Sequence, residues 1–225
     1  MSELKFSLTG IYGGTFDPIH YGHLRIAEEL TDIIGFQTIH FIPSGSPRLR
    51  CDPFASRYHR LMMTHLAIQN NSKFILDARE INREGKSSSV ESLREYKYES
   101  GDDKTALCFI IGIDAFMKLP LWYCWRELFT LCHFIIVHRP GRISMMNQDT
   151  LPQDLKKECA SRWVTNSNDL KRQSSGLVFV ASTSLLDISA TAIRSFFSAE
   201  KSTRYLLPDA VLDYINIHHL YSGEE

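Results

Sequence analysis

Short runs of apolar residues alternate along this chain with segments that repeat apolar residues every three to four positions. The short runs are typical of β-strands, whereas the repeating segments have the period of amphipathic helices. An unbroken apolar run suits a strand that is covered on both faces, as the strands of a parallel sheet are. The alternation therefore predicts an α/β fold, with a doubly wound Rossmann-like parallel sheet and helices on both faces.

The expected elements follow one another along most of the chain. Strands are expected over the ranges 4–12, 38–43, 73–78, 106–111, 133–137 and 177–181, and helices over the ranges 22–34, 56–70, 90–98, 190–198 and 209–220. The range 142–175 is polar and has no clear period, which predicts a surface excursion with short helices and loops. We therefore expect a single domain over residues 1–225, ending in a helical portion over residues 188–225.

The charge balance excludes a broad surface for binding polyanions. The chain has 25 Lys and Arg residues against 26 Asp and Glu residues, a net charge of -1, so an anionic ligand needs a local site. The five cysteines include no CxxC pair, which favours free thiols in a reducing compartment. The N-terminus lacks the pattern of a secretory signal, and no apolar stretch is long enough to span a bilayer. These features predict a cytoplasmic protein with neither a nucleic-acid nor a membrane partner.

Residues 12–24 read YGGTFDPIHYGHL and lie between the first expected strand and the first expected helix. The pair Gly13 and Gly14 lets the backbone approach a phosphate closely, and the N-terminus of the helix directs N–H groups into the same space. His20 and His23 are three positions apart and can donate ring N–H groups to the same anion. A capping or packed role is common for an isolated histidine, but two histidines in this string favour an anion site. The string is neither a GxGxxG fingerprint nor a P-loop.

The string GGTFDPIHYGHL resembles the signature GxFxPxHxGH of the nucleotidylyltransferase superfamily, and ISATAIR, residues 188–194, resembles its second signature, ISxTxxR. Within that superfamily the chain is most similar to the bacterial nicotinate-mononucleotide adenylyltransferases. The resemblance runs nearly from end to end and includes FIPSGSP, FIIGIDAF, LPLWYCW, VHRPG and LLPDAVLDYI. It implies an enzyme that transfers AMP from ATP to nicotinate mononucleotide and gives deamido-NAD and pyrophosphate.

The resemblance implies that a phosphate oxygen of the mononucleotide attacks the α-phosphorus of ATP, so that no protein nucleophile is needed. Catalysis then consists of aligning two anions and neutralising charge. The implied catalytic residues are His20, His23 and Arg194. The implied contacts of ATP and its phosphates are Gly13, Gly14, Thr15, Phe16, Gly112, Asp114, Ile188, Ser189, Thr191 and Arg194. Mg²⁺ is expected to bind together with ATP, because no cluster of carboxylates in the sequence indicates a dedicated metal site.

The resemblance also implies contacts of the mononucleotide, with the ring of Trp122 stacked on the nicotinate ring. These contacts are Arg50, Ser87, Ser88, Ser89, Trp122 and Arg139. The chain departs from the family at two of them: residues 47–50 read PRLR where PPHK or PPHR is common, and residues 87–89 read SSS where SYT is usual. The departures bear on substrate affinity and preference. Structural roles stay open for three residues. Ser189 can be a helix N-cap, Asp114 can be the N-cap of a helix that starts at Ala115, and Trp122 can be a core position.

Other functions stay open from the sequence. A phosphopantetheine adenylyltransferase shares the fold and the HxGH pattern but is a shorter protein. An enzyme that prefers nicotinamide mononucleotide would recognise an amide on the pyridine ring where nicotinate has a carboxylate. A non-catalytic nucleotide-binding regulator would be expected to lack one of the three implied catalytic residues, and all three are present. Whether copies of the chain form a homo-oligomer is also left open.

Overall fold

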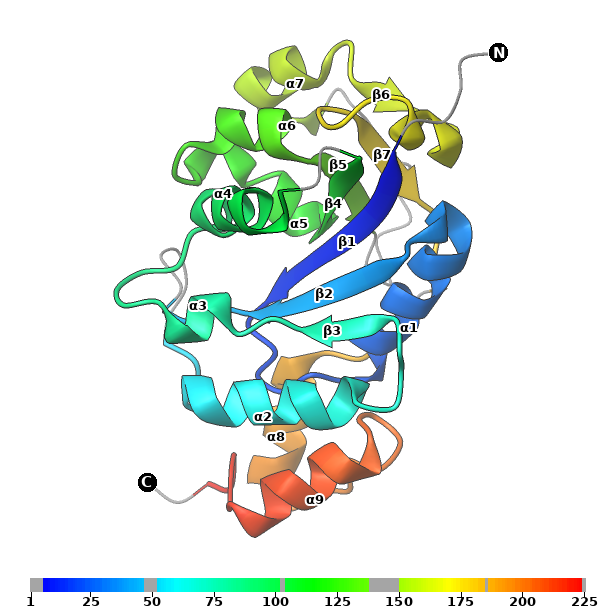
Figure 1. Cartoon of the computed structure of the whole chain (residues 1–225). Helices are drawn as coiled ribbons and strands as arrows, with labels where there is room; N and C mark the ends of the chain where they lie inside the picture. Colours follow the sequence, from blue (N-terminus) through cyan, green and yellow to red (C-terminus); the bar gives the residue numbers. More distant parts are fainter. Residues whose placement is uncertain (1–5, 47–51, 102–103, 138–149, 185, 224–225) are drawn as a thin grey trace.

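A computed structural model of the chain describes residues 6–46, 52–101, 104–137, 150–184 and 186–223. Within these ranges, seven parallel strands form one sheet in the order β3-β2-β1-β4-β5-β7-β6 (Figure 1). The strands are β1 Ser7–Gly14, β2 Thr38–Pro43, β3 Phe74–Leu76, β4 Thr105–Gly112, β5 His133–Val137, β6 Trp163–Val164 and β7 Val178–Ala181. This sheet confirms the predicted α/β fold with a doubly wound parallel sheet.

Helices connect the strands and follow the last one. They are α1 Tyr21–Leu30, α2 Arg57–Ile68, α3 Arg79–Asn82, α4 Ser89–Ser100, α5 Ile113–Phe116, α6 Leu128–Leu131, α7 Gln153–Cys159, α8 Ala190–Ser198 and α9 Asp209–Ile217. The predicted bounds of β2, β5 and α8 agree with the structure. The short elements α3, α6 and β6 were not predicted, because two to four residues are too few to establish a period.

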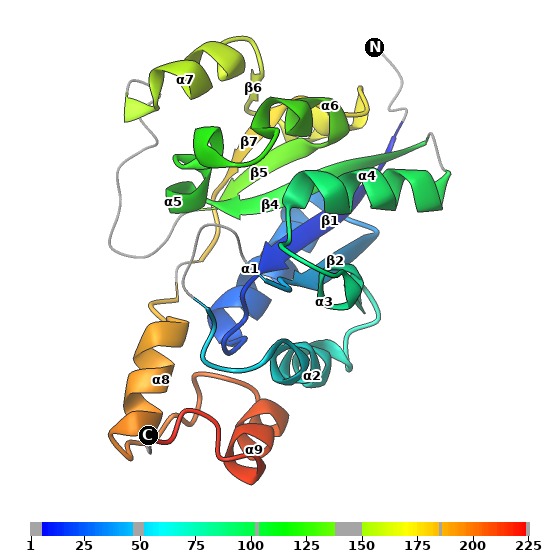
Figure 2. The same cartoon turned by 90° about the vertical axis from the view of Figure 1, so that its left-hand side faces the viewer.

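Apolar side chains cover both faces of the sheet. Along β4 they alternate between two core clusters: Cys108 and Ile110 join one, whereas Leu107 and Phe109 join the other. The first cluster also takes side chains from α1, α2, α8 and α9, and the second from α4, α6 and α7. In Figures 1 and 2, α8 and α9 lie at the end of the molecule opposite α7, and α9 lies beside α2. The C-terminal helices therefore extend the core on the face that carries α1.

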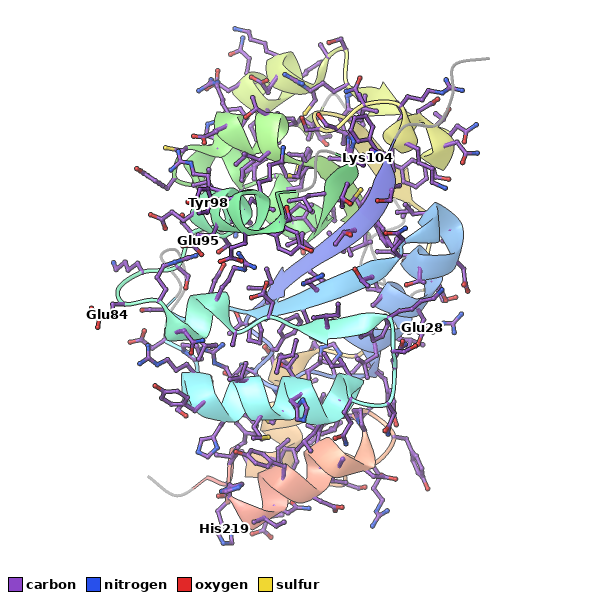
Figure 3. All side chains as sticks on the ribbon, in the orientation of Figure 1. Glu28, Glu84, Glu95, Tyr98, Lys104 and His219 are labelled. Atoms are coloured by element: carbon purple, nitrogen blue, oxygen red, sulfur yellow. The ribbon has the colours of Figure 1, made fainter. Side chains whose placement is uncertain are left out.

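Several charged and polar side chains on the described part of the chain are exposed to solvent. Glu84, Lys104 and His219 are exposed (Figure 3). The four described cysteines are free thiols, as predicted, and three of them are buried. No helix among the described residues is long and apolar enough to cross a bilayer.

His133 is a fully buried histidine at the start of β5. The N–H of Leu177 donates to its Nδ1 at 3.1 Å, so in the neutral ring the proton lies on Nε2, which is 3.0 Å from the carbonyl oxygen of Gln173. Burial lowers the pKa of His133 to about 4. The folded protein therefore holds this ring in the neutral form at pH 7.

We expect His133 to make the folded state sensitive to acid. Because its pKa is about 4 when folded, against 6.5 as the ordinary value, the unfolded chain binds a proton more readily, and stability falls as pH falls from 6.5 to 4. The expected loss is about 3 kcal/mol. Urea unfolding of the wild type and of His133→Gln at pH 7, 6, 5 and 4 measures it. Parallel pH profiles of the two proteins would contradict the prediction.

Candidate active site

The carboxyl ends of β1 and β4 meet at the middle of the sheet. β1 pairs with β2 on one side and with β4 on the other, so connections diverge at this point, where parallel sheets bind ligands. Tyr12 of β1 lies opposite Ile110 of β4, and continuing this register by two residues brings Gly14 beside Gly112. A Cβ atom on Gly112 would meet no atom within 4 Å. The ends of the two strands therefore border open space.

His20 and His23 lie at the N-terminus of α1. His20 is the N-cap residue, with an extended backbone at φ -150° and ψ 169°, and it is 6% exposed. His23 is in the first turn of the helix and is half-buried. The centroids of the two imidazole rings are 3.8 Å apart, with 32° between the ring planes. The structure therefore brings the two rings together at the positive end of the helix dipole.

The backbone of His20 sets the hydrogen-bonding pattern of His23. The N–H of His20 donates to Nδ1 of His23 at 3.3 Å, so the neutral ring carries its proton on Nε2. Phe16 packs edge-on against the His23 ring, with 5.1 Å between centroids. Its own backbone is left-handed, with φ 51°, a conformation that non-glycine residues rarely adopt outside functional loops. The loop thus fixes the orientation of the His23 ring, and the bond at Nδ1 places the proton of the neutral ring on Nε2.

Two glycines of the first signature make room for aromatic rings. A Cβ atom on Gly22 would lie 3.0 Å from Cε1 and Nδ1 of His20, and 3.5 Å from the carbonyl oxygen of Ile188. A Cβ atom on Gly14 would lie 2.7 Å from the ring of Phe16. Gly13, at the end of β1, has ordinary space around it and pairs with Ile42. The glycine before His23 is therefore required by the position of the His20 ring.

The second signature begins α8 and reaches the first one. Nη1 of Arg194 donates to the carbonyl oxygen of Asp17 at 2.6 Å, across 177 positions of sequence, and Nη2 lies 3.4 Å from Oγ1 of Thr191. The hydroxyl of Ser189 accepts the N–H of Ala192 at 3.2 Å, so Ser189 is the N-cap of α8. The geometry thus gives Ser189 the capping role, which does not preclude a contact with phosphate.

Asp17 joins three parts of the chain around the site. Its carboxylate accepts the N–H groups of Phe54 at 2.8 Å and Ala55 at 3.1 Å, and the hydroxyl of Tyr221 at 2.6 Å. The guanidinium of Arg194 covers the ring of Phe54 at 4.5 Å from its centroid. Neither Asp17 nor Tyr221 was predicted from sequence to have a role at this site. Asp17 lies inside the first signature, which was the available signal, whereas the contact with Tyr221 has no local pattern.

The three serines before α4 are largely engaged within the protein. Ser87 is buried, its N–H donates to the carbonyl oxygen of Ser46 at 2.9 Å, and its Oγ accepts the N–H of Gly45 at 3.1 Å. Ser88 is the N-cap of α4, and its hydroxyl donates to the carboxylate of Glu91 at 2.7 Å. Ser89 is the first helical residue. The backbone N–H groups of this first turn have no carbonyl partner within the helix.

Trp122 and Asp114 follow β4. Trp122 is half-buried, and its ring meets the ring of Phe109 edge-on with 6.1 Å between centroids. The helix predicted from Ala115 begins instead at Ile113 with Gly112 as its N-cap, so Asp114 is a residue of the first turn and not the cap. The capping alternative for Asp114 was therefore wrong. Arg50 and Arg139 lie outside the described residues, and so does the whole PRLR stretch, residues 47–50.

Thr15 completes the loop between β1 and α1. Its carbonyl oxygen accepts Nη1 of Arg60 at 2.8 Å, and Arg60 is buried to 1% exposure. Arg60 was not predicted from sequence to belong to the site, although an arginine among the apolar positions of α2 was a usable signal. In the described part of the chain, no group of three His, Cys, Asp or Glu residues is arranged to hold a metal ion.

Comparisons with known proteins agree on one group of enzymes. The model of the family described as cytidylyltransferase-like matches residues 11–196. A protein of Dechloromonas aromatica (strain RCB) named "probable nicotinate-nucleotide adenylyltransferase" is 41% identical over 212 residues, which cover 94% of this chain and 96% of that protein. The protein of the same name from Methylococcus capsulatus is 39% identical over 216 residues, covering 96% and 100%.

A solved structure has the same fold. The nicotinic acid mononucleotide adenylyltransferase of Plasmodium falciparum, in complex with NaAD, has a TM-score of 0.71 and 19% sequence identity to this chain. The match covers 96% of this chain and 97% of that one. At this identity the similarity shows a shared fold.

Proposed function

The chain belongs to the cytidylyltransferase-like family, and within it to the nicotinate-nucleotide adenylyltransferases, and on that premise we propose which residues carry its reaction. The enzyme transfers AMP from ATP to nicotinate mononucleotide and gives deamido-NAD and pyrophosphate. The observation that best supports an active site here is the pairing of the His20 and His23 rings, 3.8 Å apart, at the N-terminus of α1.

The transfer step needs charge neutralisation and not a protein nucleophile. A phosphate oxygen of the mononucleotide forms a bond to the α-phosphorus of ATP, and the bond from that phosphorus to the β-phosphate oxygen breaks, releasing pyrophosphate. His23 donates from Nε2 to an oxygen of the phosphoryl group, and His20 lies beside it to share the developing charge. The N–H groups of Thr15 and Phe16, with Gly13 and Gly14, border the same phosphates.

The β- and γ-phosphates of ATP lie at the start of α8. Arg194 supplies a charged fork of donors, and Ile188, Ser189 and Thr191 supply backbone N–H groups and hydroxyls around it. Asp114, after Gly112 at the end of β4, accepts from a ribose hydroxyl of the nucleotide. The divalent ion is Mg²⁺, carried by the phosphates of ATP, because Mg²⁺ sites in such enzymes are completed by substrate phosphates.

The mononucleotide lies on the other side of the same strand ends. Its carboxylate meets the N–H groups of Ser89 and Val90 at the N-terminus of α4, because the hydroxyls of Ser87 and Ser88 are already bonded within the protein. The ring of Trp122 covers the nicotinate ring. Arg50 and Arg139 complete the proposed contacts. Backbone donors favour a carboxylate over an amide, so nicotinate is the preferred ring.

Replacing Trp122 by alanine is expected to raise the KM for nicotinate mononucleotide about tenfold or more, because the stacked ring loses its platform. The KM for ATP should change by less than about threefold, since the ATP contacts lie elsewhere. Steady-state kinetics with each substrate varied in turn measure both constants, and Trp122→Phe, which keeps an aromatic face, serves as the control. An equal rise in both KM values would indicate a core role for Trp122.

Two broader properties are proposed with the function. The chain acts as a single domain, because side chains of α8 and α9 share one core cluster with those of α1 and α2. Its location is the cytoplasm, which the free thiols of the four described cysteines support.

A coupled assay tests the function. The purified protein is incubated with Mg²⁺, ATP and one of three acceptors: nicotinate mononucleotide, nicotinamide mononucleotide or phosphopantetheine. Pyrophosphate release and the mass of the product are then measured. Formation of deamido-NAD at the highest rate supports the proposal. Dephospho-coenzyme A as the main product would make the enzyme a phosphopantetheine adenylyltransferase, and no turnover with any acceptor would favour the non-catalytic regulator.

A further inference from the structure

Arg60 is a buried arginine whose side chain bonds to three backbone carbonyl groups. It lies in the first turn of α2 and is 1% exposed. Its Nε donates to the carbonyl oxygen of Ala55 at 3.2 Å, Nη1 to that of Thr15 at 2.8 Å, and Nη2 to that of Gly45 at 3.0 Å. Burying a guanidinium is costly unless its donors are satisfied, and here each of its three nitrogens has a partner.

These bonds join two loops at the candidate active site. Thr15 lies between β1 and α1, in the loop of the first signature, and Gly45 lies after β2. The carbonyl oxygen of Gly14 also accepts the N–H of Ser44 at 2.8 Å, so the same two loops are bonded twice. Arg60 thus provides a charged connection between loops that are about 30 residues apart in the chain.

The bond to Thr15 also orients a proposed phosphate contact. In a trans peptide, the carbonyl of Thr15 and the N–H of Phe16 point in opposite directions. Because Arg60 holds the Thr15 carbonyl on the α2 side, the N–H of Phe16 faces away from α2. The N–H of Thr15 is directed in the same manner by the bond between the Gly14 carbonyl and Ser44.

Gly45 is fixed from its other side by the segment that leads to α4. Its N–H donates to Oγ of Ser87 at 3.1 Å, and a Cβ atom on Gly45 would lie 2.1 Å from the carbonyl oxygen of Glu80. Glu80 is buried, and its carboxylate accepts the hydroxyl of Ser92 of α4 at 2.8 Å. Gly45 therefore lies between Arg60 and the segment of Glu80 and Ser87 that leads into α4. The mononucleotide is proposed to bind at the N-terminus of α4.

We propose that Arg60 is a positioning residue that fixes the loop of Thr15, which holds the phosphates of ATP, relative to the loop of Gly45, which supports the mononucleotide site. The inference rests on the proposed function. In-line transfer requires the two substrates to be aligned, and a displacement of about 1 Å can lower the rate about 10²-fold. Arg60 acts through the backbone and does not touch either substrate.

Arg60→Lys tests this role, because lysine keeps the charge but lacks the planar fork that reaches three carbonyls. We expect kcat to fall by about 10-fold to 10²-fold while the KM values for ATP and nicotinate mononucleotide change by less than about threefold. Arg57→Lys is the matched control, because Arg57 is the exposed arginine of the same turn and donates to the hydroxyl of Tyr58. Its kcat should equal that of the wild type.

Gly45→Ala disturbs the same loop from the side of Glu80 and Ser87 without changing the side chain of Arg60. It should also lower kcat with little change in KM. In the double variant Arg60→Lys/Gly45→Ala, the fold-decrease in kcat should be smaller than the product of the two single decreases, because both changes act through one loop. If Arg60→Lys does not fold, Gly45→Ala alone decides: an unchanged kcat overturns the proposal.

Other outcomes separate the inference from the function on which it rests. A kcat of Arg60→Lys within about threefold of the wild type, or fully multiplicative effects in the double variant, would overturn the positioning role. A lowered melting temperature with unchanged kcat would also overturn it and leave a structural role only. Absence of pyrophosphate release by the wild type would instead contradict the proposed function.

Discussion

Replacing either His20 or His23 by alanine is expected to lower kcat by about 10²-fold or more, because both rings stabilise charge that develops mainly in the transition state. The KM values for ATP and nicotinate mononucleotide should change less than kcat. The fold should persist, since His23 is half-buried at the edge of the core and His20 caps one helix. Steady-state kinetics, with circular dichroism to check the fold, measure the two effects.

A matched pair of variants at His23 separates its two nitrogens. Asparagine can accept the N–H of His20 in place of Nδ1 but offers no donor at the position of Nε2, so His23→Asn should be as inactive as alanine. Glutamine can place an amide donor near the position of Nε2, so His23→Gln should retain more activity than asparagine. His219→Ala, at an exposed histidine far along the chain, is the control for histidine loss. Near-normal turnover of both alanine variants would contradict the catalytic assignment.

Replacing Arg194 by alanine is expected to raise the KM for ATP by about 10-fold to 10²-fold, because hydrogen bonds to a charged group contribute about 1.5 to 3 kcal/mol each. The KM for nicotinate mononucleotide should stay within about threefold of the wild type. Arg194→Lys, which keeps the charge without the fork, should fall between the two proteins. The measurement is the KM for ATP at saturating mononucleotide.

The bond from Arg194 to the carbonyl of Asp17 offers a check on that interpretation. If the arginine only held Asp17 in place, its loss would affect both substrates alike, because Asp17 also binds the loop that contains Phe54 and Ala55. An unchanged KM for ATP together with a normal kcat would remove Arg194 from the triphosphate site.

The sheet could be predicted from sequence because each of its longer strands is an apolar run bounded by polar or turn residues. β5, for example, was predicted to span His133–Val137, and it has these bounds in the structure. β6 has only two residues, Trp163 and Val164, and it is a strand because β7 is available beside it. No local pattern encodes such a pairing, so the range 142–175 read as an excursion without strands.

The contacts of the candidate site also differ in whether the sequence predicts them. His20 and His23 could be placed together from sequence because they lie within one helical turn. The contacts of Asp17 with Tyr221, and of Arg60 with Thr15 and Gly45, join residues that are distant in sequence, so composition and spacing carry no sign of them.

The serines before α4 show a different limit. Their position at the start of an expected helix was readable from sequence, and the family resemblance implied that they contact the mononucleotide. The pattern did not reveal that the hydroxyl of Ser87 is engaged by Gly45 and that of Ser88 by Glu91. Because both hydroxyls are engaged within the protein, the proposal gives recognition of the carboxylate to backbone N–H groups.

The central claim is that this enzyme joins AMP to nicotinate mononucleotide, with the carboxylate met by the N-terminus of α4. The most direct test is the ratio of kcat/KM for nicotinate mononucleotide to kcat/KM for nicotinamide mononucleotide, measured by pyrophosphate release at saturating ATP. Because loss of a charged partner at a donor site costs about 1.5 to 3 kcal/mol, the expected ratio is about 10 to 10² in favour of nicotinate. A ratio near one, or one that favours nicotinamide, would contradict the account.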